Sequence, residues 1–138
     1  MSDFDDLAAV ATGMPGLIVK KDNFYTVKDK AGEIRVTDPL TGGQKGSKLA
    51  RFSLIPADWL WALAEHYGIG AQKYEDNNWR KSYKWSLSLD AHSRHLSQWL
   101  QGEKTDAETG SHHLIAAAWH LIALWWFEQH GKGTDDLR

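Results

Sequence analysis

The residues best suited to chemistry lie in one short polar stretch of the chain, residues 101–113. The stretch contains three carboxylates and two imidazoles, from Glu103, Asp106, Glu108, His112 and His113. Carboxylate oxygens are natural ligands of Mg²⁺ and Mn²⁺, so this pattern indicates a metal site. A structural role is the alternative, because Thr105 and Glu108 have the spacing of a capping box at the start of a helix.

Residues 70–80 form a second polar concentration. Lys73 could contact a phosphate, and Glu75 and Asp76 are reserve carboxylates for a metal. Tyr74 and Trp79 could stack on a base. The alternative for these two aromatic residues is that they close the end of a helical core, which is the more common role.

A glycine-rich and basic stretch, residues 37–48, offers a different kind of anion site. Its three glycines free the backbone to turn amide groups inward, and Lys45, Lys48 and Arg51 add positive charge. This combination suits a chain of phosphates, although such a loop is also typical of a solvated linker. It is not a Walker loop, because no strand leads into the required G-x-x-x-x-G-K-[ST] pattern.

Three helices are expected to position these groups. The first begins at Pro56, which suits a first helical turn, and Gly68 is expected to end it. The second covers residues 86–101 and ends at Gly102. Its apolar stripe is typical of the core-facing side of a helix and consists of Leu89, Leu96, Trp99 and Leu100.

The second expected helix also carries polar residues. Asp90 and Arg94 have the i, i+4 spacing of an ordinary surface pair. His92 and His95 lie one turn apart on the same helix. We expect His92 to face solvent, and His95, which adjoins Arg94, is the stronger candidate for function.

The third expected helix covers residues 109–129 and is apolar on almost every side. Such a helix is either central in the fold or buried in an oligomer interface. A chain of this size can hardly surround it alone, so we expect a homo-oligomer that buries it. His113 and His120 share one stripe of this helix, and a buried imidazole needs a partner. Beyond the helix, Asp135 and Asp136 are expected to belong to a frayed polar tail.

The expected fold is mostly α, with residues 52–138 as the helical domain that carries the candidate site. Residues 1–51 are expected to add a small irregular extension with a β-hairpin and the glycine-rich loop. A short helix is expected at residues 4–11. Two β-favouring runs, residues 24–27 and 34–36, are expected to pair with each other through a turn at residues 28–32.

Composition excludes several classes of function. The formal net charge of the 138 residues is −2, whereas a general nucleic-acid or membrane-surface protein would have a basic excess. The chain has no cysteine, which excludes disulfides, thiolate metal sites and cysteine nucleophiles. We expect no signal peptide and no membrane span, because no sufficiently long apolar run occurs.

Several blocks of residues, in order along the chain, resemble one known family. They are residues 41–48, 50–52, 54–56, 70–71, 73–74, 78–79, 94–96 and 102–103, with Asp106, Glu108, Thr109, Gly110 and His113. Together they resemble the phage dATP/dGTP diphosphohydrolases, which are related to the MazG-like all-α nucleoside triphosphate pyrophosphohydrolases. The resemblance covers roughly residues 37–127.

This resemblance implies a MazG-like helical bundle that hydrolyses dGTP or dATP to the monophosphate and pyrophosphate, with Mg²⁺ or Mn²⁺ as cofactor. The expected metal ligands are Glu103, Asp106 and Glu108. The residues expected to bind substrate are Lys45, Lys48, Arg51, Tyr74, Asn78 and Trp79. The residues expected to act in catalysis are Lys73, Arg94, His95 and His113. The two cations would stabilise the leaving pyrophosphate, and one of the histidines would orient or deprotonate the attacking water.

One departure from the family pattern is visible. The better-known MazG-like proteins carry two E-x-x-[ED] pairs on adjacent helices, and here Arg94, His95 and His113 occupy the corresponding helices instead. Two other nucleotide enzymes are excluded, since a zinc deaminase needs a P-C-x-x-C motif and an HD-type phosphohydrolase needs a His-Asp dipeptide. The remaining alternative is a non-catalytic nucleotide-binding or scaffolding protein of the same fold.

The partners expected from these observations are a deoxynucleoside triphosphate and further copies of the chain, with no nucleic acid and no membrane. The expected location is the cytoplasm, which is that of the host cell if a phage encodes the protein.

Overall fold

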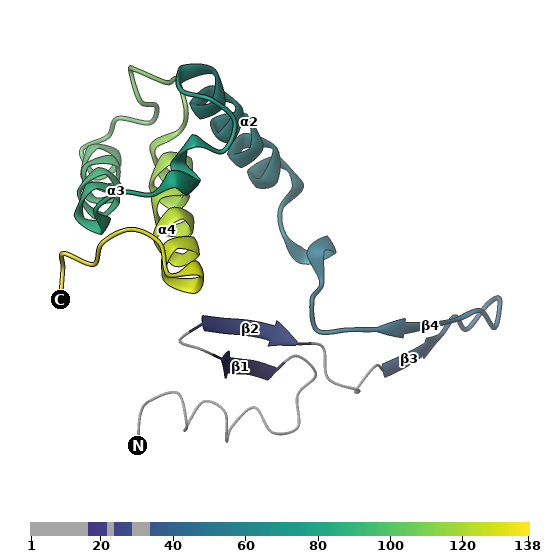
Figure 1. The fold of residues 1–138 in the computed structure, drawn as a ribbon. Helices are drawn as coiled ribbons and strands as arrows, with labels where there is room; N and C mark the ends of the chain where they lie inside the picture. Colours follow the sequence, from purple (N-terminus) through teal and green to yellow (C-terminus); the bar gives the residue numbers. More distant parts are fainter. Residues whose placement is uncertain (1–16, 22–23, 29–33) are drawn as a thin grey trace. The chain divides into compact units, whose positions relative to one another are not determined.

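The computed structural model describes residues 17–21, 24–28 and 34–138, and for residues 17–21 and 24–28 it describes the backbone alone. The chain forms two compact units, Met1–Leu54 and Ile55–Arg138 (Figure 1). The described part is mostly helical with short antiparallel strands before the helices, as expected. The helix expected at residues 4–11 lies outside the described residues. None of the described helices is long and apolar enough to cross a membrane.

The first unit contains two separate antiparallel hairpins. Strand β1 (Leu17–Lys21) pairs with β2 (Phe24–Lys28), and β3 (Ile34–Thr37) pairs with β4 (Gln44–Ser47). The expected pairing of residues 24–27 with residues 34–36 is therefore wrong, although both runs are strands. Strand β2 has a nearer partner along the chain, because only two residues separate β1 from β2, and a short connection favours hairpin pairing. Strand β3 pairs instead with the strand that follows it, β4.

The glycine-rich stretch forms the turn between β3 and β4. The Asp38 carboxylate accepts hydrogen bonds from the amides of Leu40 (2.8 Å) and Thr41 (2.9 Å), and the Gly42 amide donates to the Asp38 carbonyl (2.9 Å). Gly42 has a φ of 75°, which glycine adopts without strain. The amides of this turn therefore already have acceptors inside it. A short 3₁₀ helix, η1 (Phe52–Leu54), follows.

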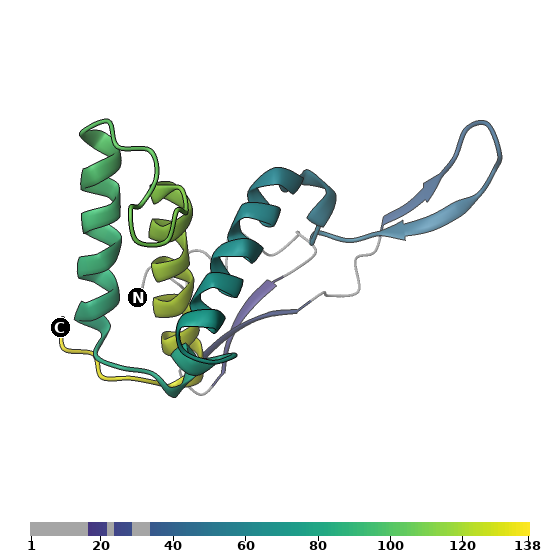
Figure 2. The ribbon, with the colours of Figure 1, turned by 90° about the horizontal axis from the view of Figure 1, so that it is seen from above.

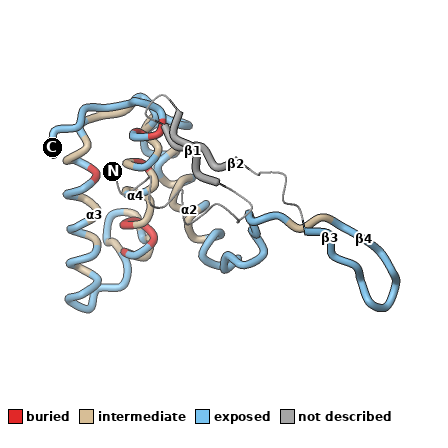
Figure 3. The backbone as a smooth tube through the Cα atoms, turned by 90° about the horizontal axis from the view of Figure 1, so that it is seen from below, coloured by how far each residue is buried: buried red, intermediate tan, exposed pale blue. Residues whose placement is uncertain are grey.

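The second unit is built around its last helix. It contains α2 (Ala57–Lys73), the 3₁₀ helix η2 (Asn78–Lys81), α3 (Trp85–Leu100) and α4 (His113–His130). Helix α4 lies between α2 and α3 and packs against both (Figure 2). All fully buried apolar side chains among the described residues belong to α4, namely Ile115, Ala116, Ala117, Ala123 and Phe127 (Figure 3). The nearly uniform apolar character of α4 thus reflects its central position.

Helix α2 continues past the residue that was expected to end it. Gly68 and Gly70 both lie inside α2, which ends at Lys73, so the prediction that Gly68 stops the helix is wrong. An interior glycine costs about 1 kcal/mol relative to alanine but still makes its backbone hydrogen bonds. The chain leaves the helical conformation at Tyr74 and then reverses at Asn77, whose φ of 58° is left-handed.

Helix α4 begins at His113, four residues later than expected, because residues 105–112 form a closed loop. The Asp106 amide donates to the Ser111 carbonyl (2.8 Å), and the Gly110 amide donates to the Asp106 carbonyl (2.7 Å). The helix is capped by His112, whose Nδ1 accepts from the Leu114 amide (3.0 Å). The capping box proposed from Thr105 and Glu108 is therefore wrong.

Helix α3 turns its polar side toward α4. Ser88 donates to or accepts from His120 Nδ1 (3.1 Å), His92 Nδ1 donates to the Ala117 carbonyl (2.8 Å), and His95 Nδ1 contacts His113 Nδ1 (2.9 Å). We call these six residues the α3–α4 polar interface. The apolar stripe expected to face the core is instead exposed, at fractions from 36% to 72%: Leu89, Leu96, Trp99 and Leu100.

Two expectations for α3 are therefore wrong, that its leucine stripe faces the core and that His92 faces solvent. The physical reason is that α4 presents imidazoles and a carbonyl to α3. Polar groups buried at a helix interface must find partners, and Ser88, His92 and His95 have the matching ones.

The C-terminal tail is ordered against the start of α3 and is not frayed as expected (Figure 2). The Asp136 carboxylate accepts from the Ser86 amide (2.9 Å) and from the Ser86 hydroxyl (2.5 Å). Trp85 donates its amide to the Thr134 carbonyl (3.0 Å) and its indole Nε1 to the Lys132 carbonyl (3.0 Å). The tail thus supplies the acceptors that the free amides of a helix N-terminus require.

We expect Gly133→Ala to destabilise the second unit. Gly133 has a φ of +73°, and an added Cβ would lie 2.5 Å from the Tyr83 carbonyl oxygen and 2.9 Å from Trp85 Nε1. The matched control is Gly102→Ala, because Gly102 also has a positive φ (+98°) but open space around a Cβ. The steric overlap should make Gly133→Ala less stable than the control by about 1–3 kcal/mol. Urea denaturation of both variants measures this difference, and equal stabilities would contradict the tight packing of the tail.

Candidate active site

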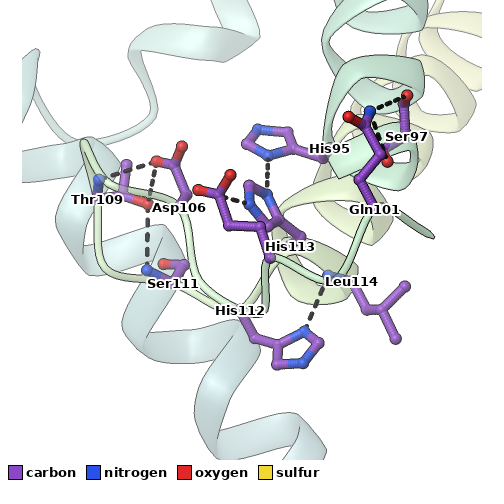
Figure 4. A network of polar contacts seen from close by, with 10 residues as sticks. His95, Ser97, Gln101, Asp106, Thr109, Ser111, His112, His113 and Leu114 are labelled. Carbon is purple, nitrogen blue, oxygen red and sulfur yellow. Dashed lines mark hydrogen bonds and ion pairs between the residues drawn. The ribbon is translucent and has the colours of Figure 1, made fainter. Parts of the chain in front are cut away.

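Two histidines from different helices meet at the end of the α3–α4 pair where the loop of residues 101–112 joins the two helices. His95, near the end of α3, and His113, the first residue of α4, bring their Nδ1 atoms to 2.9 Å (Figure 4). The His113 side chain is 0% exposed, and its Nε2 lies 3.4 Å from Glu103 Oε1. This contact does not have hydrogen-bond geometry, so His113 Nε2 has no hydrogen-bond partner among the described residues. The sequence expectation that His113 needs a partner is thus met on its Nδ1 side.

Asp106 completes a three-residue cluster with these histidines. One ligand atom from each of His95, Asp106 and His113 lies within 4.8 Å of the others, and we call this group the histidine–aspartate cluster. Thr109 holds the carboxylate in place by donating its amide (2.9 Å) and its hydroxyl (2.8 Å) to Asp106 Oδ2 (Figure 4). Partial burial alone would raise the pKa of Asp106. The Thr109 hydrogen bonds and the two nearby imidazoles outweigh burial and hold this pKa below its usual range.

The cluster has the donor atoms that a divalent cation requires. Burial lowers the pKa of the His95 imidazole, although Asp106 acts in the opposite direction, so the ring is neutral at pH 7 and keeps a lone pair. Two imidazole nitrogens and one carboxylate are a common ligand set for a catalytic metal, which keeps its other positions open. Of the three carboxylates expected as ligands, Asp106 lies in the cluster, Glu103 lies beside His113, and Glu108 pairs with Lys73.

Two further histidines lie close to the cluster. His66 on α2 has its Nδ1 2.7 Å from the Ser111 hydroxyl, and burial lowers the pKa of its imidazole. His120 on α4 contacts Ser88, whose hydroxyl also lies 2.7 Å from the Tyr83 hydroxyl. Burial, aided by the neighbouring histidines, lowers the pKa of His120 to about 4. Both rings are therefore neutral at pH 7.

A cleft of about 980 Å³ opens beside the cluster, within the second unit. Its walls come from the second half of α2, from η2, from α3, from the loop before α4 and from Trp119 and His120 of α4. His95 and Asp106 line it, whereas His113 lies behind them. The volume is near the upper end of the range typical for small-molecule sites.

Most of the functional residues expected in the second unit line this cleft. They are Lys73, Tyr74, Asn78, Trp79, Arg94, His95, Asp106 and Glu108, with the reserve carboxylates Glu75 and Asp76. Lys73 forms an ion pair with Glu108, which raises the pKa of Lys73. Arg94 has no ion pair within the described part of the chain, so the expected surface pair with Asp90 does not form. Its guanidinium can therefore take an anionic partner from the cleft.

The two aromatic residues of the cleft differ in their surroundings. Tyr74 is 67% exposed, with Lys73 Nζ 5.4 Å from the centre of its ring. Trp79 is half-buried and packs edge-on against Trp119 and Trp126, at ring-centre distances of 5.9 and 5.1 Å. Trp79 therefore closes the helical core, as the structural alternative held, while one side of it still lines the cleft.

The remaining polar residues at this end of the cleft are held by each other. The Glu75 carboxylate pairs with Lys81 and also accepts from Asn78 Nδ2 (3.1 Å). These contacts, the Lys81 pair first, hold the pKa of Glu75 below its usual range. Glu75 is thus already neutralised by residues of its own loop.

The basic residues expected to bind phosphates from the N-terminal part lie in the first unit. Lys45 lies on β4, Lys48 follows that strand, and Arg51 precedes η1. Because the amides of the β3–β4 turn already have acceptors, these side chains, rather than the turn backbone, are the candidates for contact with an anion.

Sequence reasoning missed His66 and the role of Thr109. A single histidine on an amphipathic helix gives no local signal, because its partner Ser111 lies 45 residues away. The role of Thr109 could have been found, because an Asp side chain in a turn commonly accepts hydrogen bonds from backbone amides a few residues later. The expectation that His120 needs a buried partner is confirmed, and that partner is Ser88.

Comparison with known proteins adds a family relationship. Residues 39–137 match the family model described as dATP/dGTP diphosphohydrolase, N-terminal. The dATP/dGTP diphosphohydrolase of Salmonella phage PMBT28 is 33% identical over 99 residues, which are 72% of this chain and 34% of that relative. The chain thus spans about a third of the relative's length. No solved structure matches the chain.

The buried histidines should make folding stability fall in mild acid. An unfolded chain protonates His120 near pH 6.5, whereas the folded chain does so at about pH 4. Stability from this group is therefore full above pH 7 and is lost as the pH falls through 6.5 toward 4. The loss between pH 7 and pH 5 should be on the order of 2 kcal/mol, with His66 and His95 acting in the same direction. Urea denaturation at both pH values, with chelator present, measures it.

The comparison variant for this measurement is His120→Gln, which keeps a polar contact for Ser88 but does not titrate. It should lower the stability at pH 7 and shrink the difference between pH 7 and pH 5. A variant with the same pH difference as the parent chain would show that His120 is not the source.

Proposed function

The chain belongs to the dATP/dGTP diphosphohydrolase N-terminal family, and on that premise we propose that it hydrolyses deoxypurine nucleoside triphosphates. The substrates are dGTP, dATP or both, and the products are the monophosphate and pyrophosphate. The name of the phage relative supports this substrate class. The proposal rests on one observation: Arg94 and Lys73 line the same cleft as His95 and Asp106 of the histidine–aspartate cluster.

Two cations of the cleft would hold the phosphates. Arg94 offers a planar guanidinium without a competing carboxylate among the described residues, which suits bidentate contact with a phosphate. Lys73 is paired with Glu108 on the exposed rim, so a triphosphate would replace one carboxylate by a more highly charged anion. Lys45, Lys48 and Arg51 of the first unit are proposed as further phosphate contacts.

The base of the nucleotide would lie against the aromatic side of the cleft. Tyr74 is the most exposed ring there and is the candidate for stacking on a purine. Trp79 would form the fixed wall behind it, because its ring is held by Trp119 and Trp126. Asn78 is bonded to Glu75 and could offer its amide oxygen to the substrate.

A divalent cation, Mg²⁺ or Mn²⁺, would be held by His95, Asp106 and His113. When bound, it would neutralise phosphate charge and lower the pKa of an attacking water. The cleft also has neutral imidazoles outside the cluster that can take a proton from that water, on His66 and His120. His113 is fully buried and acts only through the cluster.

The proposal is tested by incubating the protein with each dNTP and either Mg²⁺ or Mn²⁺ and identifying the products. A deoxynucleoside monophosphate with pyrophosphate supports it. Binding of the nucleotide without turnover would overturn it in favour of the non-catalytic nucleotide-binding protein. Release of inorganic phosphate instead of pyrophosphate would also overturn it, because the bond cleaved would be a different one.

We expect Arg94→Gln to lower kcat/KM by about 10–100-fold while leaving the melting temperature unchanged. The reason is that a charge-assisted hydrogen bond to a phosphate contributes about 1.5–3 kcal/mol, whereas the exposed arginine makes no ion pair with the rest of the described chain. Lys104→Gln is the matched control, because it removes the same charge from a residue that does not line the cleft.

The same assay on a Lys45→Gln, Lys48→Gln double variant should show a raised KM. Unchanged kinetics in a folded variant would show that the substituted arginine or lysines do not bind the substrate.

The second unit also has an apolar face that a further copy of the chain could cover. Leu89, Leu96 and Leu100 of α3 are exposed, and so are Leu114, Leu121 and Trp125 of α4. Several of these residues directly follow a member of the α3–α4 polar interface, so they lie about 100° around their helix from it. Because α3 and α4 are antiparallel, this rotation brings both stripes to the same side.

We therefore expect a homo-oligomer in which this α3–α4 face is buried. Light scattering at micromolar concentration should give a mass above that of one chain. A Leu121→Glu, Trp125→Glu double variant should shift the mass toward the monomer, because an obligate interface does not accept buried unpaired charge. The control is Leu137→Glu, which changes an exposed leucine of the tail outside this face. A fully active monomer would contradict the expectation.

A further inference from the structure

The contact between His95 and His113 has an unusual feature in that both partners use the same type of nitrogen. The two Nδ1 atoms lie 2.9 Å apart, and a hydrogen bond between them needs one to be protonated and the other not. When both rings instead carry their proton on Nε2, two lone pairs converge on the space beside this contact. A cation that accepts both lone pairs can then take the place of the shared proton.

The two histidine nitrogens already have the spacing that one cation needs, and the Asp106 carboxylate must move to complete the set. Two neighbouring ligands at ~2.1 Å from an octahedral cation lie ~3.0 Å apart, and opposite ligands lie ~4.2 Å apart. The Nδ1 atoms are at 2.9 Å, and the Asp106 ligand atom is within 4.8 Å of both histidine ligand atoms. Because Asp106 can lie opposite only one of the two nitrogens, closing the set needs a movement of its carboxylate of up to about 2 Å. His95 and Asp106 also line the cleft, so the open coordination positions would face it.

Glu103 lies where it could become the hydrogen-bond partner of His113 Nε2, a buried atom of the cluster. His113 Nε2 is buried and has no hydrogen-bond partner among the described residues, but Glu103 Oε1 lies 3.4 Å away. If Nδ1 binds the cation, Nε2 must carry the proton and can donate it to the Glu103 carboxylate. Metal-binding histidines commonly donate their second ring N–H to a carboxylate in this way, which fixes the tautomer and raises ligand basicity. Glu103 would thus act on the cation through His113.

The donor set also selects the kind of cation. Mg²⁺ prefers oxygen ligands and retains much of its water, whereas imidazole nitrogen suits first-row transition cations. We propose that His95, Asp106 and His113 bind Mn²⁺, Fe²⁺, Co²⁺ or Zn²⁺ in preference to Mg²⁺, with Glu103 as the hydrogen-bond partner that orients His113. The role of this cation in hydrolysis rests on the proposed function. Its binding by the three residues does not depend on that function.

The test is direct metal binding to the chelator-treated chain. Binding is measured by calorimetry and by the visible absorption of bound Co²⁺. The expected result is one site that binds Mn²⁺, Co²⁺ and Zn²⁺ at least ~10-fold more tightly than Mg²⁺. His95→Gln and Asp106→Asn should each weaken Co²⁺ binding by more than ~100-fold, and Glu103→Gln should weaken it by ~10–100-fold. Glu108→Gln is the matched control, because Glu108 pairs with Lys73 and should leave Co²⁺ affinity unchanged.

Folding of each variant is checked by circular dichroism and thermal melting in chelator. His95→Gln carries the most weight, because His95 is half-buried and its loss should not prevent folding, whereas His113 is completely buried. Equal affinity for Mg²⁺ and Mn²⁺ would overturn the proposal. Loss of Co²⁺ binding in Glu108→Gln with retention in a folded His95→Gln would also overturn it.

The same measurements separate this proposal from the proposed function. Tight Co²⁺ binding that depends on His95, in a chain that hydrolyses no dNTP with any of these cations, would leave the metal site standing and remove the function. Hydrolysis of dGTP or dATP that His95→Gln does not affect would support the function and overturn this metal site.

Discussion

The polar interface between α3 and α4 is the constraint on which the second unit depends. Ser88, His92 and His95 must face α4, because a buried imidazole or hydroxyl without a partner costs more than an exposed leucine. This requirement sets the rotation of α3 about its own axis. It brings His95 onto His113 and at the same time turns the α3 leucine stripe away from the core.

The same rotation gives the unit two different sides. One side carries the cleft, which the half-buried His95 and Asp106 line beside Arg94 and Lys73. The other carries the apolar stripes of α3 and α4. A single helix orientation therefore determines both where the charged residues line the cleft and where an apolar face is left exposed.

The loop before α4 has a related role. Its backbone closes on itself between Asp106 and Ser111, and Thr109 fixes the Asp106 carboxylate within that loop. The loop then leads directly into the helix whose first residue is His113. A carboxylate from a loop and imidazoles from two helices are thus positioned by the loop, by the packed helices and by the contact between the two histidines. This is the kind of preorganisation that a binding site requires.

The sequence by itself determined the helical class, the approximate extents of α3 and α4, and that α4 must be covered on more than one side. These features depend on local periodicity and on the apolar content of single segments, which act over a few residues. The family resemblance included 11 of the 25 residues that line the cleft, because its blocks are read in order along the chain. It could not say which of these residues contact each other.

Only the tertiary structure decided the partners. Strand pairing between residues 24–27 and 34–36 was predicted wrongly because β propensity marks both runs as strands but does not reveal the partner of either one. The leucine stripe of α3 was assigned to the core because periodicity reports that a helix is amphipathic and not which side is covered. Glu108 looked like a helix cap from its spacing, yet it pairs with Lys73, 35 residues away. In each case the deciding contact joins residues that local sequence does not connect, so its energy appears only when the chain is folded.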